Sequence, residues 1–167
     1  MKMKKKKGLS GVITAIILIA LVMTLVGIVW GVVKGILDEK LEGAKSCFGN
    51  FEKVKLNNRD TCYYNNTKEF NFYISIGDID IDGVLILIKG NGTGKSIKIP
   101  GNYSYVKPYG GGYGQNISLP SKNSGLTYIL NTTGAGIQDP NTIQIAPVIN
   151  SKKCEVSDSL APVDRCG

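Results

Sequence analysis

The stretch that most constrains the fold is the run from Leu9 to Val33, which is apolar and carries no charged residue. As an α-helix this run would be roughly 37 Å long, because each residue adds about 1.5 Å, whereas the hydrocarbon layer of a bilayer is about 30 Å thick. It therefore predicts a helix that can span a membrane. An ordinary secretory signal has its cleavage site after the apolar region, but here the small residue Gly8 stands in front of it.

The residues before the run are a block of lysines at positions 4–7, followed directly by Gly8. This order resembles the class III signal of the type IV pilin superfamily, in which a membrane peptidase cuts just after the glycine. The resemblance implies cleavage between Gly8 and Leu9, so that the apolar helix becomes the mature N-terminus and packs with its copies in a filament core. Bacterial members carry glutamate at the fifth mature position, which is Ile13 here. This difference, together with Gly11, favours the archaeal pilins and archaellins.

The net charge of +7 comes largely from the N-terminus, where Lys2 and the lysines at 4–7 supply five of the 20 basic residues. Their removal would leave about +2. Positive charge beside a membrane helix favours the cytoplasmic side, so the remainder of the chain is expected outside the cell. The other basic residues are dispersed, and we expect no nucleic-acid partner. The alternative to a cleaved leader is a plain signal anchor that keeps its lysines.

Three glycines, Gly27, Gly31 and Gly35, recur every fourth residue and so share one face of the expected helix. Small residues at this spacing let two helix backbones approach closely in lipid, which predicts a packing surface between copies. The alternative is that glycine is simply common in membrane helices. Beyond Val33, charged and apolar residues alternate with helical period, so the helix is expected to continue to about Ser46.

From Phe48 onward the period changes to two, as in Phe70, Phe72 and Ile74, which alternate with polar neighbours. Short strands bounded by Asn, Gly and Pro turns, with no second helical stretch, predict an antiparallel β-sandwich or barrel. The fold class is therefore α+β, similar to type IV pilins. With the resemblance, the expected organisation is a cleaved leader at 1–8, a membrane and filament-core helix at 9–46, and an extracellular β-rich head at 47–167. Strands are expected at 51–56, 68–76, 83–89, 95–99, 103–107, 116–119, 126–130 and 142–149.

The four cysteines, Cys47, Cys62, Cys154 and Cys166, all follow the helix and so lie on the side expected to be extracellular, where disulfides form. Four cysteines allow three connectivities. Sequence proximity favours Cys47–Cys62 and Cys154–Cys166. A zinc site is the competing interpretation, but the chain has no histidine and no Cys-x-x-Cys motif.

The glycosylation sequon Asn-x-Ser/Thr occurs five times, all after the helix. With 13 asparagines and 20 serines plus threonines in the chain, chance would give about 1.6. The excess predicts N-glycans on an exposed head, as on the archaeal surface filaments that the chain resembles. The alternative is accidental matches in an Asn-rich and Thr-rich β protein. The sequons begin at Asn65, Asn91, Asn102, Asn116 and Asn131.

Two motifs suggest ligands. The segment Gly90–Ser96 is similar to a nucleotide-binding P-loop, but Lys89 stands where the first glycine is needed, and the residues after Lys95 indicate a strand rather than a helix. An Asn-Gly hairpin turn accounts for it better. The second motif is Asp78, Asp80 and Asp82, which match the start of a calcium loop, although position 12 of that loop is again Lys89. These aspartates are either a partial calcium site or the solvent face of a strand.

The sequence offers no enzyme chemistry. The absence of histidine removes the usual general base and most catalytic metal sites, and no catalytic residue, cofactor or further metal is expected. Tyrosines around the glycine-rich segment 110–114 could form an adhesive patch or simply cover a β surface. They are Tyr103, Tyr105, Tyr109 and Tyr113.

The expected function is that of a pilin, a structural subunit of an extracellular archaeal type IV pilus-like filament that serves surface adhesion. Its expected partners are copies of itself, a prepilin peptidase, and an assembly ATPase with its membrane platform protein, all implied by the resemblance. Before assembly it would be a single-pass membrane protein with a cytoplasmic N-terminus. One alternative is an archaellin of a motility filament. Another is a single-pass anchored surface module that binds glycans or proteins.

Overall fold

The computed structural model describes residues 9–47 and 52–166 of the 167-residue chain, which divides into two compact units, Met1–Glu42 and Gly43–Gly167. The leader expected at 1–8, including Gly8 of the expected cleavage site, lies outside the described residues.

The first unit is formed by helix α1, which runs without a break from Leu9 to Cys47 and confirms the helix expected over 9–46. Its apolar residues surround the whole circumference of the helix rather than one stripe. From Val12 to Leu37 its large apolar side chains are 40–69% exposed. The segment Gly11–Asp38 is long and apolar enough to cross a membrane. A helix suits that setting because it satisfies its own backbone hydrogen bonds.

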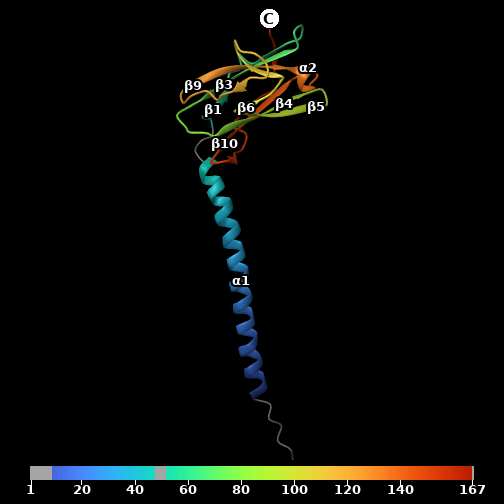
Figure 1. The fold of residues 1–167 in the computed structure, drawn as a ribbon. Helices are drawn as coiled ribbons and strands as arrows, with labels where there is room; N and C mark the ends of the chain where they lie inside the picture. Colours follow the sequence, from blue (N-terminus) through green and yellow to red (C-terminus); the bar gives the residue numbers. More distant parts are fainter. Residues whose placement is uncertain (1–8, 48–51, 167) are drawn as a thin grey trace, which may run out of the picture. The chain divides into compact units, whose positions relative to one another are not determined.

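The second unit is a head built of two β-sheets and one short additional pair (Figure 1). Sheet A has the order β13-β2-β3-β9-β7, and β1 also pairs with β3. Its strands are β1 (Val54–Leu56), β2 (Cys62–Tyr64), β3 (Glu69–Ile76), β7 (Val106–Pro108), β9 (Ser124–Asn131) and β13 (Asp164–Arg165).

Sheet B has the order β11-β10-β4-β5, and β12 also pairs with β10. Its strands are β4 (Gly83–Gly90), β5 (Thr93–Ile99), β10 (Thr142–Ile149), β11 (Lys152–Lys153) and β12 (Asp158–Leu160). The additional pair joins β6 (Gly101–Asn102) to β8 (Asn116–Ile117). The strand pairs are antiparallel, except that β13 runs parallel to β2. The head thus confirms the expected α+β class.

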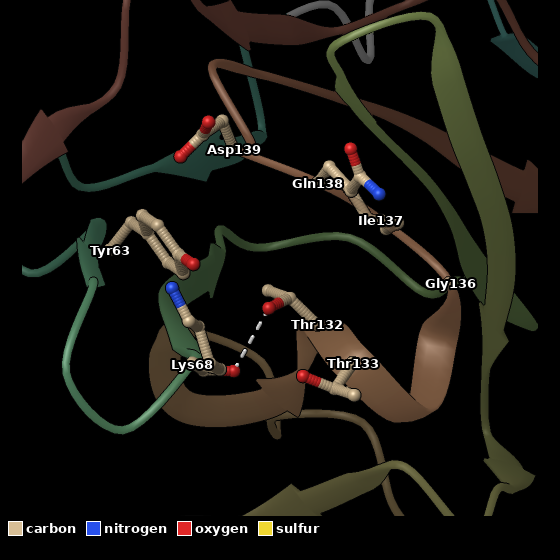
Figure 2. A pocket seen from close by; sticks show the side chains of 8 residues that line it. All are labelled: Tyr63, Lys68, Thr132, Thr133, Gly136, Ile137, Gln138 and Asp139. Carbon is tan, nitrogen blue, oxygen red and sulfur yellow. Dashed lines mark hydrogen bonds between the residues drawn. The ribbon is translucent and has the colours of Figure 1, made fainter.

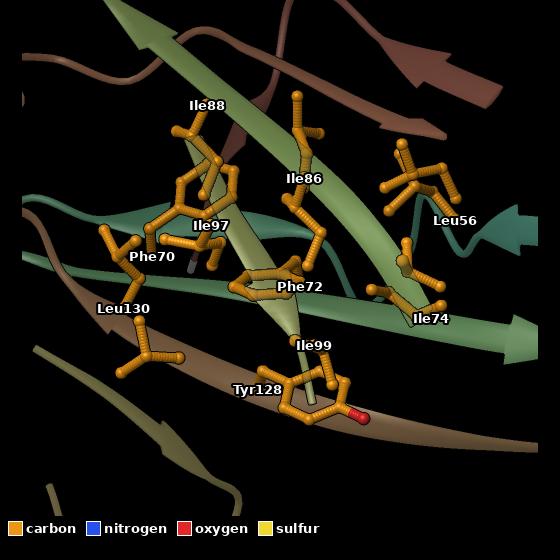
Figure 3. Close-up of a cluster of buried hydrophobic side chains, with 14 of the residues drawn as sticks. Leu56, Phe70, Phe72, Ile74, Ile86, Ile88, Ile97, Ile99, Tyr128 and Leu130 are labelled. Atoms are coloured by element: carbon orange, nitrogen blue, oxygen red, sulfur yellow. The ribbon is translucent and has the colours of Figure 1, made fainter. Parts of the chain in front are cut away.

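One apolar core lies between the two sheets (Figure 3). The period of two along β3 turns Phe70, Phe72 and Ile74 inward, each at most 1% exposed. Sheet B contributes the buried Ile86 and Ile88, also at most 1% exposed. Because both sheets bury their inner faces in the same core, the head is a sandwich.

The long strands lie where the sequence predicts them, and the short elements account for the differences. Five short strands were not expected, each of only two or three residues, which is too short for a periodic signal: β2, β6, β11, β12 and β13. The expectation of no second helical stretch is wrong for α2 (Thr132–Ala135). The Asn131 side chain caps the start of α2 by accepting a hydrogen bond from Gly134 N, and Gly136 ends it at φ 72°.

The predicted disulfide pairing is wrong. The bonds join Cys47 to Cys154 and Cys62 to Cys166, with Cα–Cα distances of 5.5 and 5.1 Å. The reason is the sheet topology. Strand β13 pairs with β2 by placing Asp164 opposite Cys62, which brings the C-terminal cysteine to β2 from 104 residues away. Proximity in sequence is a poor guide where a sheet brings distant strands together. The expectation that all four cysteines form disulfides is met.

Candidate functional site

Helix α1 presents a continuous apolar surface: across Gly11–Asp38, where the structure describes the side chains, they are all exposed. An exposed apolar surface of this extent marks a site of contact with lipid or with other protein chains. The helix is therefore the main candidate functional element.

The three glycines of α1 have no role within the described part of the chain. A Cβ atom added at Gly27, Gly31 or Gly35 would meet no atom within 4 Å. Glycine inside a helix destabilises it by about 1 kcal/mol relative to alanine. Glycine at these positions thus weakens the helix without a compensating contact in the described part of the chain. A surface on which another helix backbone approaches closely would account for this cost. Whether copies pack there stays a prediction.

The five sequons fall into two groups on the head. Asn102 and Asn116 lie opposite each other on β6 and β8, both exposed, and the Asn102 Nδ2 donates to Asn116 Oδ1 at 3.1 Å. The other three, Asn65, Asn91 and Asn131, adjoin one pocket. This grouping joins segments up to 66 residues apart in the chain, so no sequence signal could have revealed it.

The pocket has a volume of about 420 Å³ and lies beside α2 (Figure 2). Its polar lining includes Lys68, Thr133, Gln138 and Asp139, and its apolar lining includes Ile137. Pockets of this size accept small ligands, and a few polar groups fix their orientation. Figure 2 shows the side chain of Lys68 extending toward the ring of Tyr63 at one side of the pocket.

Each of the three sequons touches this lining or adjoins it in sequence. The Asn65 Oδ1 accepts a hydrogen bond from Lys68 Nζ at 3.0 Å. The Asn91 Nδ2 donates to Asp139 Oδ2 at 3.3 Å. Asn131 is half-buried, and the third residue of its sequon, Thr133, lines the pocket. The other four sequon asparagines are exposed, so they are better placed than Asn131 to carry a glycan.

The glycine-rich segment 110–114 is tied to sheet A by Tyr113, whose hydroxyl donates to Glu69 Oε1 at 2.8 Å. Lys107 Nζ lies 3.0 Å from the same oxygen and 4.5 Å from the centre of the Tyr113 ring. Burial raises the Glu69 pKa, but the hydrogen bonds from Tyr113 and Lys107 and the Lys107 charge outweigh burial and hold it below 4.5. Burial, and then the bond to Glu69, raises the pKa of Tyr113 to about 12.

We expect Tyr113→Phe to reduce the loss of head stability between about pH 10 and pH 12. The folded-state pKa of Tyr113 lies above its ordinary value of 10.0, so the unfolded chain ionises first. The stabilising effect is therefore complete below pH 10 and is lost as pH rises to about 12. Thermal unfolding measured in a pH series tests this. The matched control is Tyr109→Phe, on a ring that is 75% exposed. Parallel alkaline losses in wild type and Tyr113→Phe would contradict it.

The four tyrosines around the glycine-rich segment differ in their contacts. The rings of Tyr103 and Tyr105 pack at 5.6 Å and rest against the core, whereas Tyr113 is bound to Glu69. Tyr109 remains a largely exposed ring. Three of the four rings therefore have structural contacts.

The segment with Asp78, Asp80 and Asp82 is a loop between β3 and β4 in which the aspartates are exposed and Ile79 and Ile81 pack against the core. It is not assigned as a strand. Asp80 forms an ion pair with Lys122 at 2.7 Å, and Asp82 accepts a hydrogen bond from Ser151 N at 2.7 Å. Within the described residues these carboxylates do not form a group that could hold a metal ion.

The segment Gly90–Ser96 forms the tip of the β4–β5 hairpin, as the Asn-Gly signal predicts. Gly90 pairs with Thr93, which leaves Asn91 and Gly92 as the turn. A strand rather than a helix follows, so this segment lacks the helix N-terminus on which a P-loop binds phosphate.

The comparisons with known proteins found no matching family model, curated protein or solved structure. Any assignment to a family therefore rests on the architecture alone, which is a long N-terminal apolar helix followed by a disulfide-bonded β domain. This architecture is consistent with a pilin-like subunit. The apolar helix and the two disulfides favour a membrane or extracellular location.

Proposed function

We propose that this chain is a pilin, the structural subunit of an extracellular filament similar to archaeal type IV pili. The observation that carries the proposal is α1, an exposed apolar helix whose three in-register glycines make no close contact with the rest of the described chain. Such a surface is stable in lipid before assembly and against identical helices afterwards.

The proposed assembly follows from this change of surroundings. A prepilin peptidase removes the lysine-rich leader after Gly8, which takes away the charges that hold the N-terminus in the cytoplasm. An assembly ATPase and its platform protein then move α1 from lipid into a bundle of copies. The head remains outside, where it serves surface adhesion and where its two disulfides are stable.

The proposal predicts that Gly8→Arg abolishes filaments while the chain stays in the membrane. A large charged residue at the cleavage site blocks the peptidase, so the lysines remain attached and keep the N-terminus in the cytoplasm. Electron microscopy of sheared surface material, with an immunoblot of the membrane fraction, measures both outcomes. The control is Gly43→Arg, the same change far from the cleavage site. Normal filaments built from uncleaved Gly8→Arg chains would overturn the proposal.

A further inference from the structure

We infer that the pocket beside α2 binds the first sugar of an N-glycan carried by Asn91. The inference rests on the extracellular placement of the head in the proposed function, but not on filament formation. Its starting point is the direct contact of this sequon with the pocket wall, through both its backbone and its side chains.

The sequon Asn91–Thr93 is docked onto the segment that carries Gln138 and Asp139 (Figure 2 shows both side chains at the pocket). Asn91 N donates to Gln138 O at 2.9 Å, and Gln138 N donates to Thr93 Oγ1 at 3.4 Å. The preceding Gly90 lies so close that a Cβ there would collide with the Gln138 carbonyl oxygen. The hairpin tip and the pocket wall are therefore one packed unit.

The atom that would carry the glycan is directed at the pocket lining. Asn91 Nδ2 lies 3.3 Å from Asp139 Oδ2, and Asp139 lines the pocket. A glycosylated amide nitrogen keeps one hydrogen, so this bond can persist after the sugar is attached. Asp139 is itself held by Arg165, whose Nη2 is 3.2 Å from Oδ1. The first sugar would thus begin beside a fixed carboxylate.

The lining offers the contacts that a pyranose ring needs. Hydroxyl and amide groups of a sugar can pair with the Gln138 amide, the Thr133 hydroxyl and the Lys68 ammonium. The volume of about 420 Å³ lies in the range of small-ligand sites. By contrast, Asn102 and Asn116 are exposed on β6 and β8 and do not line this pocket. Their glycans would extend into solvent.

The test measures how much Gln138→Ala changes the melting temperature of the full chain in detergent. This change is compared between the glycosylated and the unglycosylated chain. The glycosylated form comes from the native cells and the other from a host that does not glycosylate. Gln138→Ala should lower the melting temperature of the glycosylated chain by about 3 °C, as expected for one lost polar contact. It should leave the unglycosylated chain unchanged, and Asn91→Gln in native cells should remove the effect. Gln144→Ala, the same change on β10, is the matched control and should not differ between the two forms.

Mass spectrometry of the native glycopeptides gives a second readout and should find Asn91 modified. An unmodified Asn91 would overturn the inference. A Gln138→Ala effect of equal size in both forms would also overturn it, because this would indicate a purely structural role. The absence of any effect in either form would overturn it as well. The measurement uses the detergent-solubilised chain, so it can fail while the filament proposal stands, and it can succeed if no filament forms.

Discussion

Replacing Cys62 and Cys166 by serine should lower the free energy of unfolding of the head by about 2–5 kcal/mol. The bond closes a separation of 104 residues and holds β13, a strand of only two residues, beside β2. Without the bond the unfolded chain gains conformational freedom, and the C-terminal strand keeps only a short pairing. Denaturant unfolding of the full chain in detergent measures the loss.

The double variant Cys47→Ser with Cys62→Ser, called the mixed variant, tests which cysteines are paired. Because these residues belong to different bonds, the mixed variant loses both and leaves Cys154 and Cys166 as free thiols. Thiol labelling followed by intact mass should therefore find two reactive thiols. If Cys47 were paired with Cys62, as their proximity in sequence suggested, the same variant would show none. That result would contradict the connectivity described here.

Replacing Gly31 with leucine should abolish filaments while leaving the amount of membrane-inserted chain unchanged. Within the described part of the chain a Cβ atom at Gly31 meets nothing within 4 Å, and the surrounding side chains of α1 are exposed, so the helix itself should tolerate leucine. Leucine is also a better helix former than glycine. Between copies, the added bulk would separate backbones that the glycine face allows to approach. Electron microscopy of sheared appendages, with a membrane immunoblot, tests both parts.

Val29→Leu is the matched control, because Val29 lies on the opposite side of the helix from the glycines and gains only one methylene. We expect filaments to form in this variant. Equal filament yield from Gly31→Leu and Val29→Leu would show that the glycine face is not a packing surface. Loss of the Gly31→Leu chain from the membrane would point instead to a defect in insertion.

The sequence predicted the parts of the fold that depend on local pattern. The uncharged run from Leu9 defined α1, and the period of two around Phe72 defined β3, because burial acts on every second residue of a strand. The same holds for the hairpin at Asn91 and Gly92, where the turn chemistry is local.

The features that the sequence could not give depend on contacts between distant segments. The pairing of Cys62 with Cys166 follows from the β2–β13 ladder, which has too few residues to leave a periodic signal. The pocket joins Lys68 to Asp139 across 71 positions, so the sequons around it look scattered in the sequence. Helix α2 was missed because only its caps, Asn131 and Gly136, mark it.

The most direct test of the filament proposal is the mass of the subunit in sheared and purified surface filaments. The proposal predicts a mature chain that begins at Leu9, together with attached glycans and with all four cysteines in disulfides. Filament subunits that still carry residues 1–8 would contradict it, and so would filaments that lack this chain while the chain with residues 1–8 is found only in the membrane.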